Sequence, residues 1–224
     1  MKILSIETAS KICAVALLEN DKLIKEKLLE DENTHSVKLM PLVDELLKHE
    51  NVTIHDIDLF ACDKGPGSFT GVRIGVSTVK AFLDVTNKKA VGITSLEALA
   101  YNSEKDGIIC TMLDAKNGNI YYGFFEKVEN NIKQLEELNF DNISNVLEKI
   151  YKEDKQIIFI GDASQNYEEL IKSKLAKKAI FLEDKRRNKL NARNIGLAAY
   201  YKKEEAIDSN ELIPTYLRKS NAER

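Results

Sequence analysis

Hydrophobic and polar positions alternate in three neighbouring segments at the start of the chain. Lys2–Thr8, Ile12–Leu18 and Lys22–Leu29 each have the pattern of a strand. The turn Glu19–Asp21 separates the last two, and no connection among the three segments is long enough for a crossover helix. The pattern therefore predicts an antiparallel meander.

After the meander, the hydrophobic period alternates between that of helices and that of short buried strands. In chain order we expect the helix Thr34–His49, the strand Ile57–Cys62, the helix Thr70–Val85, the strand Ala90–Ile93 and a helix from Ser95 to Tyr101. Asn33 or Thr34 is predicted to cap the first helix, and Pro41 to kink it.

The second half of the chain begins again with strands and continues with helices. We expect strands at Gly107–Leu113, Ile120–Lys127, Gln156–Ile160 and Ala179–Leu182, and helices at Ile143–Tyr151, Tyr167–Leu175 and Ala192–Lys203. Asn117 and Gly118 are typical of a type I′ hairpin turn between the first two of these strands. The pattern breaks near residues 102–106, and its repetition predicts two related α/β halves.

The two long helices of the first half carry features that predict a further packing partner. Apolar side chains of the first helix cover an arc of roughly 160° at about 100° per residue, which is wider than packing on one core requires. These residues are Leu39, Met40, Leu42, Val43, Leu46 and Leu47. In the second helix, Gly71 and Gly75 each cost about 1 kcal/mol relative to alanine, which predicts a close approach of another backbone. Packing on the chain's own sheet and packing on another helix are equally favoured, and the other helix is either the first helix or one of another subunit. Arg73 lies on the same helix and is expected to face a partner.

A glycine-rich segment, Asp63–Gly75, follows a predicted strand and opens the second helix. Gly65 and Gly67 permit tight backbone turns, and Ser68 or Thr70 is suited to cap the helix. The N–H groups at a helix start also suit an anion. The segment matches neither G-x-x-x-x-G-K-[ST] nor G-x-G-x-x-G, so a structural turn is favoured over an anion site.

Candidate catalytic residues are few. The histidines are His35, His49 and His55. None stands four residues from another, so a helical metal-binding pair is missing, and His35 is expected to be a cap or a surface residue. Asp63 and Asp114 each end a strand, where capping of a turn is favoured over chemistry. Thr8 and Ser10 lie in the first β-turn, where a phosphate could be held, although the core there needs no such role.

Composition narrows the class of protein further. The chain has 224 residues, of which 43% are hydrophobic and 31% charged, as is usual for globular proteins, and its net charge is −3. A protein that binds nucleic acid alone is usually basic, so contact with nucleic acid is expected to run through a partner or a local patch.

Cys13, Cys62 and Cys110 lie in apolar runs and are expected to be buried free thiols in a reducing cytoplasm. The first ten residues are too polar for a signal peptide, and no apolar run reaches the roughly 18 residues of a membrane span.

Several short motifs occur in an order that resembles the bacterial TsaB (YeaZ) family. The most specific motif is Gly65–Gly75, GPGSFTGVRIG. The others are Ser5–Ala9, Thr34–Ser36 followed by Leu39–Pro41, Thr94–Ala100, Leu113–Ala115 and Pro214–Arg218. One departure is Glu7, where members usually carry aspartate, and it argues against phosphate or metal chemistry at this turn.

The resemblance implies the actin-like, sugar-kinase-like (ASKHA) α/β fold, built from two ribonuclease-H-like halves with mixed sheets. On this basis residues 1–103 are expected to form the first domain, completed by the C-terminal helix and tail at about 190–224. Residues 104–189 are expected to form a second, smaller or degenerate domain of the same kind.

The resemblance also implies a role in forming threonylcarbamoyladenosine beside the tRNA anticodon. The catalytic paralogue of that system, TsaD, holds a metal with two histidines four residues apart. The matching places here are Ser95 and Leu99, which cannot hold a metal as imidazoles do. The implied role is therefore a non-catalytic partner and activator of TsaD, with no metal and no cofactor of its own; ATP or ADP at the subunit junction is left open. Implied partners are TsaD, the ATPase TsaE, a second copy of this chain when TsaD is absent, and tRNA only through the complex, with no membrane.

The two long helices are the expected partner interface. Its candidate residues are His35, Leu39, Met40, Val43, Leu46, Gly71, Arg73, Gly75, Thr78 and Phe82. The candidates for an anion or a nearby nucleotide are Thr8, Ser10, Gly65, Gly67 and Ser68. Two alternatives are a stand-alone ATP-dependent phosphotransferase or ATPase of the same fold, and a metallopeptidase. The lack of a clear adenosine motif argues against the first, and the missing histidine pair argues against the second.

Overall fold

The chain divides into two compact units. The computed structural model describes residues 1–30, 35–152 and 154–218. The first unit comprises Met1–Ala98 and Leu190–Tyr216, and the second comprises Leu99–Lys189. Leu217 and Arg218, which the sequence analysis placed with the first domain, group with the second unit.

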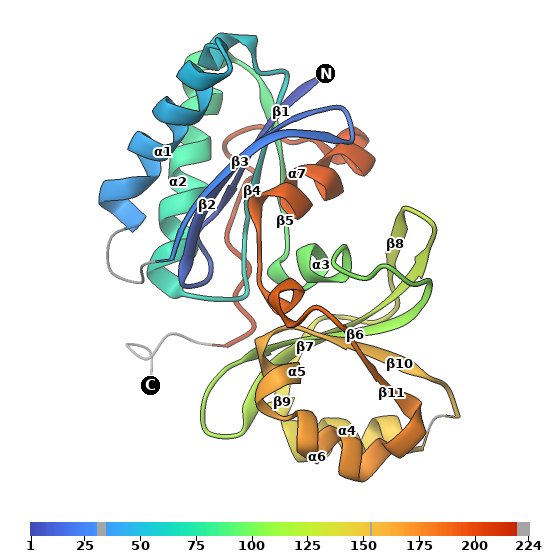
Figure 1. The fold of residues 1–224 in the computed structure, drawn as a ribbon. Helices are drawn as coiled ribbons and strands as arrows, with labels where there is room; N and C mark the ends of the chain where they lie inside the picture. Colours follow the sequence, from blue (N-terminus) through green and yellow to red (C-terminus); the bar gives the residue numbers. More distant parts are fainter. Residues whose placement is uncertain (31–34, 153, 219–224) are drawn as a thin grey trace. The chain divides into compact units, whose positions relative to one another are not determined.

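A five-stranded mixed sheet forms the centre of the first unit (Figure 1). In spatial order its strands are β3 (Lys22–Glu30), β2 (Ile12–Glu19), β1 (Lys2–Glu7), β4 (Leu59–Asp63) and β5 (Lys89–Ile93). β1, β2 and β3 are antiparallel neighbours, and β4 and β5 continue the sheet parallel to β1. The predicted meander and the two short strands after it are confirmed.

Helices cover both faces of this sheet, which explains why β1 is buried along almost its whole length. α1 (His35–His49) and α2 (Phe69–Thr86) share a core with Leu4 and Ile6 of β1. The side chains of a strand alternate between faces, so Ser5 points the other way, toward α7 (Ala192–Tyr201). Its Oγ donates a hydrogen bond to the carbonyl oxygen of Ala192 at 2.7 Å.

The helices of the first unit begin and end close to their predicted bounds. α1 runs without interruption through Pro41, whose side chain is exposed, and the expected caps Asn33 and Thr34 lie outside the described residues. α2 extends the predicted helix by one residue at each end, and the predicted third helix is α3 (Ser95–Ala100). The remaining helical turns are the short η1 (Ile54–Asp56) and η4 (Lys203–Glu205).

The second unit repeats the strand order of the first. In spatial order its sheet contains β11 (Ala179–Phe181), β10 (Ile157–Ile160), β6 (Gly107–Asp114), β7 (Asn119–Val128) and β8 (Asn131–Gln134), with β9 (Asn139–Asn142) also paired to β7. β6, β7 and β8 are antiparallel, and β10 and β11 continue parallel to β6. Both sheets therefore consist of an antiparallel triplet extended by two parallel strands, which accounts for the repetition in the sequence.

The second unit has a separate apolar core, which includes side chains of α4 (Ile143–Tyr151), α5 (Asp162–Asn166) and α6 (Glu168–Leu175). The short helical turns η2 (Ala176–Lys178) and η3 (Lys185–Asn188) also belong to this unit. β8, β9 and α5 were not predicted, because their sequences, NIKQ, NFDN and DASQN, are mostly polar and contain no apolar run. The predicted hairpin turn is confirmed: Asn117 and Gly118 have φ values of 56° and 75°, and Asn119 N donates to the carbonyl oxygen of Lys116 at 3.1 Å.

Two further expectations concern the thiols and the membrane. All three cysteines are buried and free, as predicted. Among the residues that the structure describes, no helix has the length and apolar character needed to cross a membrane.

The C-terminal segment completes the first unit. Ala90 of β5 and Ile207 exchange two backbone hydrogen bonds, at 3.0 and 2.8 Å. Leu212 is 1% exposed and belongs to the core shared by α1 and α2, whereas the next residue, Ile213, is 64% exposed. The tail is therefore a packed part of the unit rather than an appendage.

We predict that Leu212→Ala lowers the free energy of unfolding of the first unit by about 2–5 kcal/mol, because it leaves a cavity in a close-packed core. Ile213→Ala is the matched control, since it removes an exposed side chain and is expected to change stability by no more than about 0.5 kcal/mol. Urea unfolding followed by circular dichroism measures both. Equal stability of the two variants would show that the tail does not contribute to the core.

Candidate functional site

The turn after β1 lies against the first turns of α2. Ser68 N donates to the carbonyl oxygen of Ala9 at 2.7 Å, and Thr8 Oγ1 donates to the carbonyl oxygen of Gly71 at 2.8 Å. A Cβ atom at Gly67 would overlap the carbonyl oxygen of Ala9, and one at Gly71 would overlap that of Thr8. Only glycine permits this approach of one backbone to another.

Gly75 continues the same contact one helical turn further along. A Cβ atom there would lie 2.5 Å from Thr8 Oγ1, and both residues are buried. The close approach at Gly71 and Gly75 is therefore made by the end of β1 in the same chain. The alternative of packing on the chain's own sheet is the one observed, and the explanation by a facing helix of another subunit is wrong.

The start of α2 is capped from within the chain. Of the two candidate caps, Ser68 is the one used, and its Oγ accepts a hydrogen bond from Gly71 N at 3.2 Å. Gly65 has a φ of +94°, and a Cβ atom there would lie 2.8 Å from the carbonyl oxygen of Thr215. Close packing of backbone accounts for the glycines of this loop without an anion.

Two buried carboxyl groups, Glu7 and Asp63, lie beneath the loop at the ends of β1 and β4. Glu7 Oε1 accepts from Ser10 N at 3.0 Å, and Asp63 Oδ1 accepts from Gly65 N at 2.7 Å. Two of the backbone donors proposed for an anion thus already have acceptors. Burial and the negative charge of Asp63 raise the pKa of Glu7 well above its usual range, and burial also raises that of Asp63.

The two strand-terminal aspartates cap turns, as the sequence analysis favoured. Asp63 accepts from the backbone N–H two residues later, at Gly65, and Asp114 does the same with Lys116 N at 2.9 Å. Such Asx turns are a common structural use of aspartate. These contacts account for both residues without a catalytic role.

Ser95 and Leu99, which the resemblance matches with the metal-binding histidines of TsaD, are both buried. Ser95 Oγ donates to Asp63 Oδ1 at 2.7 Å, and Leu99 lies in the interior. Within residues 1–30, 35–152 and 154–218 there is no group of three or more His, Cys, Asp or Glu side chains arranged to hold a metal ion. Ser95 offers a hydroxyl group and Leu99 a hydrocarbon side chain, and neither is an imidazole that could bind a metal as histidine does.

The apolar arc of α1 is explained mainly by its own core. The buried members of the arc are Leu39, Leu42, Val43, Leu46 and Leu47. The inference that the arc is too broad for one contact is therefore wrong, because the sheet and α2 together cover most of it. Met40 is the exception at 48% exposure, and the neighbouring Val37 is 68% exposed.

His35 lies inside the chain rather than at the surface, contrary to expectation. It is 5% exposed, and its Nε2 lies 2.9 Å from the carbonyl oxygen of Ser10. A carbonyl can only accept, so Nε2 carries the hydrogen in this contact. His35 thereby joins the start of α1 to the turn after β1.

Three residues form an exposed cluster that the sequence analysis missed as a unit. The Arg73 guanidinium lies 3.8 Å from the centre of the Phe69 ring, and Arg73 Nε donates to the Tyr216 hydroxyl at 2.9 Å. The two rings are 4.9 Å apart, and Thr215 N donates to the carbonyl oxygen of Lys64 at 2.6 Å. Phe69 and Arg73 are four residues apart on one helix, so their contact could have been predicted from the sequence. Nothing in the sequence predicts that Tyr216 joins them.

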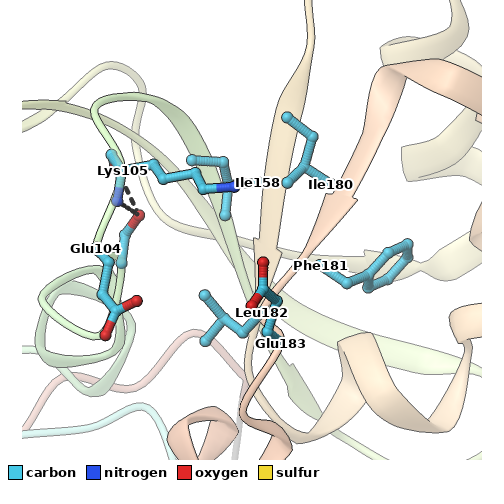
Figure 2. A pocket seen from close by; sticks show the side chains of 8 residues that line it. Glu104, Lys105, Ile158, Ile180, Phe181, Leu182 and Glu183 are labelled. Atoms are coloured by element: carbon cyan, nitrogen blue, oxygen red, sulfur yellow. Dashed lines mark hydrogen bonds between the residues drawn. The ribbon is translucent and has the colours of Figure 1, made fainter.

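The second unit contains a small pocket of about 40 Å³ (Figure 2). Its walls include Ile158 of β10, Ile180 and Phe181 of β11, and the polar residues Glu104 and Glu183. Ligand pockets are typically about 300–1,000 Å³, so this one has room for water rather than for a nucleotide.

Comparison with known proteins places the chain among proteins of tRNA modification. A protein-family model described as "TsaD: tRNA N6-adenosine threonylcarbamoyltransferase" matches residues 24–224. The tRNA threonylcarbamoyladenosine biosynthesis protein TsaB of Bacillus subtilis is 32% identical over all of this chain and 96% of that protein.

Solved structures show the same fold at lower identity. YeaZ from Pseudomonas aeruginosa matches with a TM-score of 0.78 and 20% identity, over 96% of this chain and 99% of that one. The ROK hexokinase of Thermus thermophilus matches with a TM-score of 0.54 and 9% identity, over 90% and 99% of the two chains. The expected actin-like, sugar-kinase-like fold is thus confirmed.

We predict that Gly71→Ala lowers the free energy of unfolding by about 1–3 kcal/mol, because the new Cβ forces the turn after β1 away from α2. Helix propensity alone predicts the opposite sign, a gain of about 1 kcal/mol. Ser77→Ala, at an exposed position of the same helix, is the control, and it should stay within about 0.5 kcal/mol of the wild type. A stabilised Gly71→Ala variant would contradict the contact described.

Proposed function

Because this chain belongs to the TsaB (YeaZ) family, whose members take part in tRNA threonylcarbamoyladenosine biosynthesis, we propose that it is the non-catalytic partner and activator of TsaD. One observation carries the proposal. Ser95, which the resemblance matches with one of the two metal-binding histidines of TsaD, is buried and donates a hydrogen bond to Asp63; the second matched position is Leu99. A hydroxyl that donates to a buried carboxylate is not available as a metal ligand.

The proposed docking surface is the outer side of α1 and α2. Met40 is the most exposed apolar candidate there, and Arg73 is also exposed. Thr78 and Phe82 are half-buried between the core and the surface. Aromatic side chains, methionine and arginine are enriched in protein interfaces, which supports a protein partner for this side of the unit.

The buried candidates have a supporting role in this proposal. Leu39, Val43 and Leu46 anchor α1 on the core, and Gly71 and Gly75 anchor α2 on the turn after β1. They fix the position of the two helices without themselves reaching a partner. A second copy of this chain binds the same surface when TsaD is absent.

The remaining partners act through the complex. With a net charge of −3, the chain offers little counterion release, so tRNA contacts are assigned to the assembled complex. TsaE is proposed as the ATPase partner, and any ATP or ADP is placed at a subunit junction rather than on this chain alone.

We predict that TsaD forms threonylcarbamoyladenosine on tRNA efficiently only when this chain is added, in a reconstitution that also contains TsaE, ATP and an activated threonylcarbamoyl donor. This chain without TsaD should give no product, with or without a divalent metal, because it lacks the histidine pair. Liquid chromatography and mass spectrometry of the digested tRNA measure the product. Transfer or peptidase activity of the isolated chain would refute the non-catalytic role, and equal yield without the chain would refute activation.

We predict that Met40→Asp weakens binding to TsaD at least tenfold, or about 1.4 kcal/mol, because a carboxylate would be buried at the interface. The melting temperature should change little, since Met40 is 48% exposed. Val128→Asp is the matched control, because Val128 is an apolar residue of the second unit that is slightly more exposed than Met40, at 57%. Titration calorimetry gives the affinities, and unchanged affinity of Met40→Asp would exclude this surface.

A further inference from the structure

Two buried carboxyl groups lie side by side in the first unit. Glu7 ends β1 and Asp63 ends β4, and neither is exposed. The two strands pair in parallel with Ile6 opposite Cys62, so the next residues of the strands, Glu7 and Asp63, are neighbours. The interior of a protein disfavours even one free carboxylate, and two together repel each other.

One oxygen of each carboxyl group has its hydrogen bonds from the chain. Glu7 Oε1 accepts from Ser10 N, and Asp63 Oδ1 accepts from Gly65 N and Ser95 Oγ. The other two oxygens, Glu7 Oε2 and Asp63 Oδ2, are buried and have no hydrogen-bond donor among the described residues. If both groups were ionised, these two oxygens would be left without hydrogen bonds in the core, where an unsatisfied charged group is costly.

We infer that Glu7 binds a proton at neutral pH and donates it from Oε2 to Asp63 Oδ2. This one proton satisfies both remaining oxygens, so that every carboxyl oxygen of the pair takes part in a hydrogen bond. Glu7 is the donor because Asp63 already accepts two hydrogen bonds that stabilise its anion, whereas Glu7 accepts one. The pair then carries a single negative charge and ties the end of β1 to the end of β4.

The neighbouring titratable groups do not neutralise the pair. Cys13 on β2 and Cys62 on β4 are buried thiols; burial raises the pKa of Cys13 to about 11 and raises that of Cys62 further, so both are uncharged at neutral pH. Lys64 directly follows β4 and its charge lowers the pKa of Cys62 against the larger effect of burial, and His35 of α1 contacts Ser10 rather than the carboxyls. No ion pair joins Glu7 or Asp63 to a cation in the described part of the chain.

The proton links stability to pH with a definite sign. The folded chain raises the pKa of Glu7 through burial and the adjacent Asp63, whereas in the unfolded chain it is about 4.3. The stabilisation that Glu7 contributes is therefore fully present below about pH 4.3. It is lost as the pH rises through the raised pKa of Glu7 in the folded chain. Within that window the folded chain holds one more proton, so the unfolding constant increases up to about tenfold per pH unit.

Glu7→Gln tests the inference because its amide retains the shape and supplies a permanent N–H donor to Asp63. The unfolding constants of both proteins are measured in urea between about pH 5 and 7. The ratio of the wild-type constant to that of the variant should rise by up to about tenfold for each pH unit. Parallel pH dependence of the two proteins would overturn the inference.

A second measurement holds even if Glu7→Gln fails to fold. The wild type with isotope-labelled glutamate carboxyl carbon should show the infrared band of a protonated acid at neutral pH. The matched control is Glu97→Gln: Glu97 is also buried but lies 2.9 Å from Lys202 Nζ, so the acid band should be unchanged in this variant. Absence of the band in the wild type would refute the inference. Loss of the band on adding Mg²⁺, with a higher melting temperature, would show a cation site and refute it equally.

Discussion

The first unit depends on the contact between the turn after β1 and the start of α2. Carbonyl oxygens of Thr8 and Ala9 lie where Cβ atoms of Gly71 and Gly67 would otherwise be. This contact allows the helix to lie directly on the end of the strand, closer than side chains would permit. Because α1 packs on the same core, the position of both helices follows from this approach of two backbone segments.

Hydrogen bonds within the chain also engage backbone donors at this end of the sheet. Donors that could bind an anion are used inside the chain: Ser68 N bonds to Ala9, and Gly65 N bonds to Asp63. Ser95 also turns its hydroxyl inward. These donors are thus engaged within the chain, while Met40 and Arg73 remain exposed on the outer side of the helices.

The two sheets share one topology but differ in the length of their strands. Each consists of an antiparallel triplet extended by two parallel strands. In the first unit the sheet is covered on both faces, by α1 and α2 and by α7. In the second, β8, β10 and β11 have only three or four residues each, and shorter strands bury less apolar surface. The first unit also recruits the C-terminal segment, which pairs with β5 and adds Leu212 to the core.

The sequence by itself determined the strands and helices with a strong period, the type I′ turn at Asn117 and Gly118, and the burial of the cysteines, because each of these depends on local spacing or on hydrophobicity. It also predicted a close neighbour at Gly71 and Gly75, since glycine in a helix is otherwise unfavourable. The tertiary structure alone decided that this neighbour is Thr8, through its backbone at Gly71 and through its side chain at Gly75. Glu7 and Asp63 are 56 residues apart, and only the parallel pairing of β1 with β4 makes them neighbours. The meeting of Arg73 with Tyr216 likewise depends on the path of the tail, which no local period encodes.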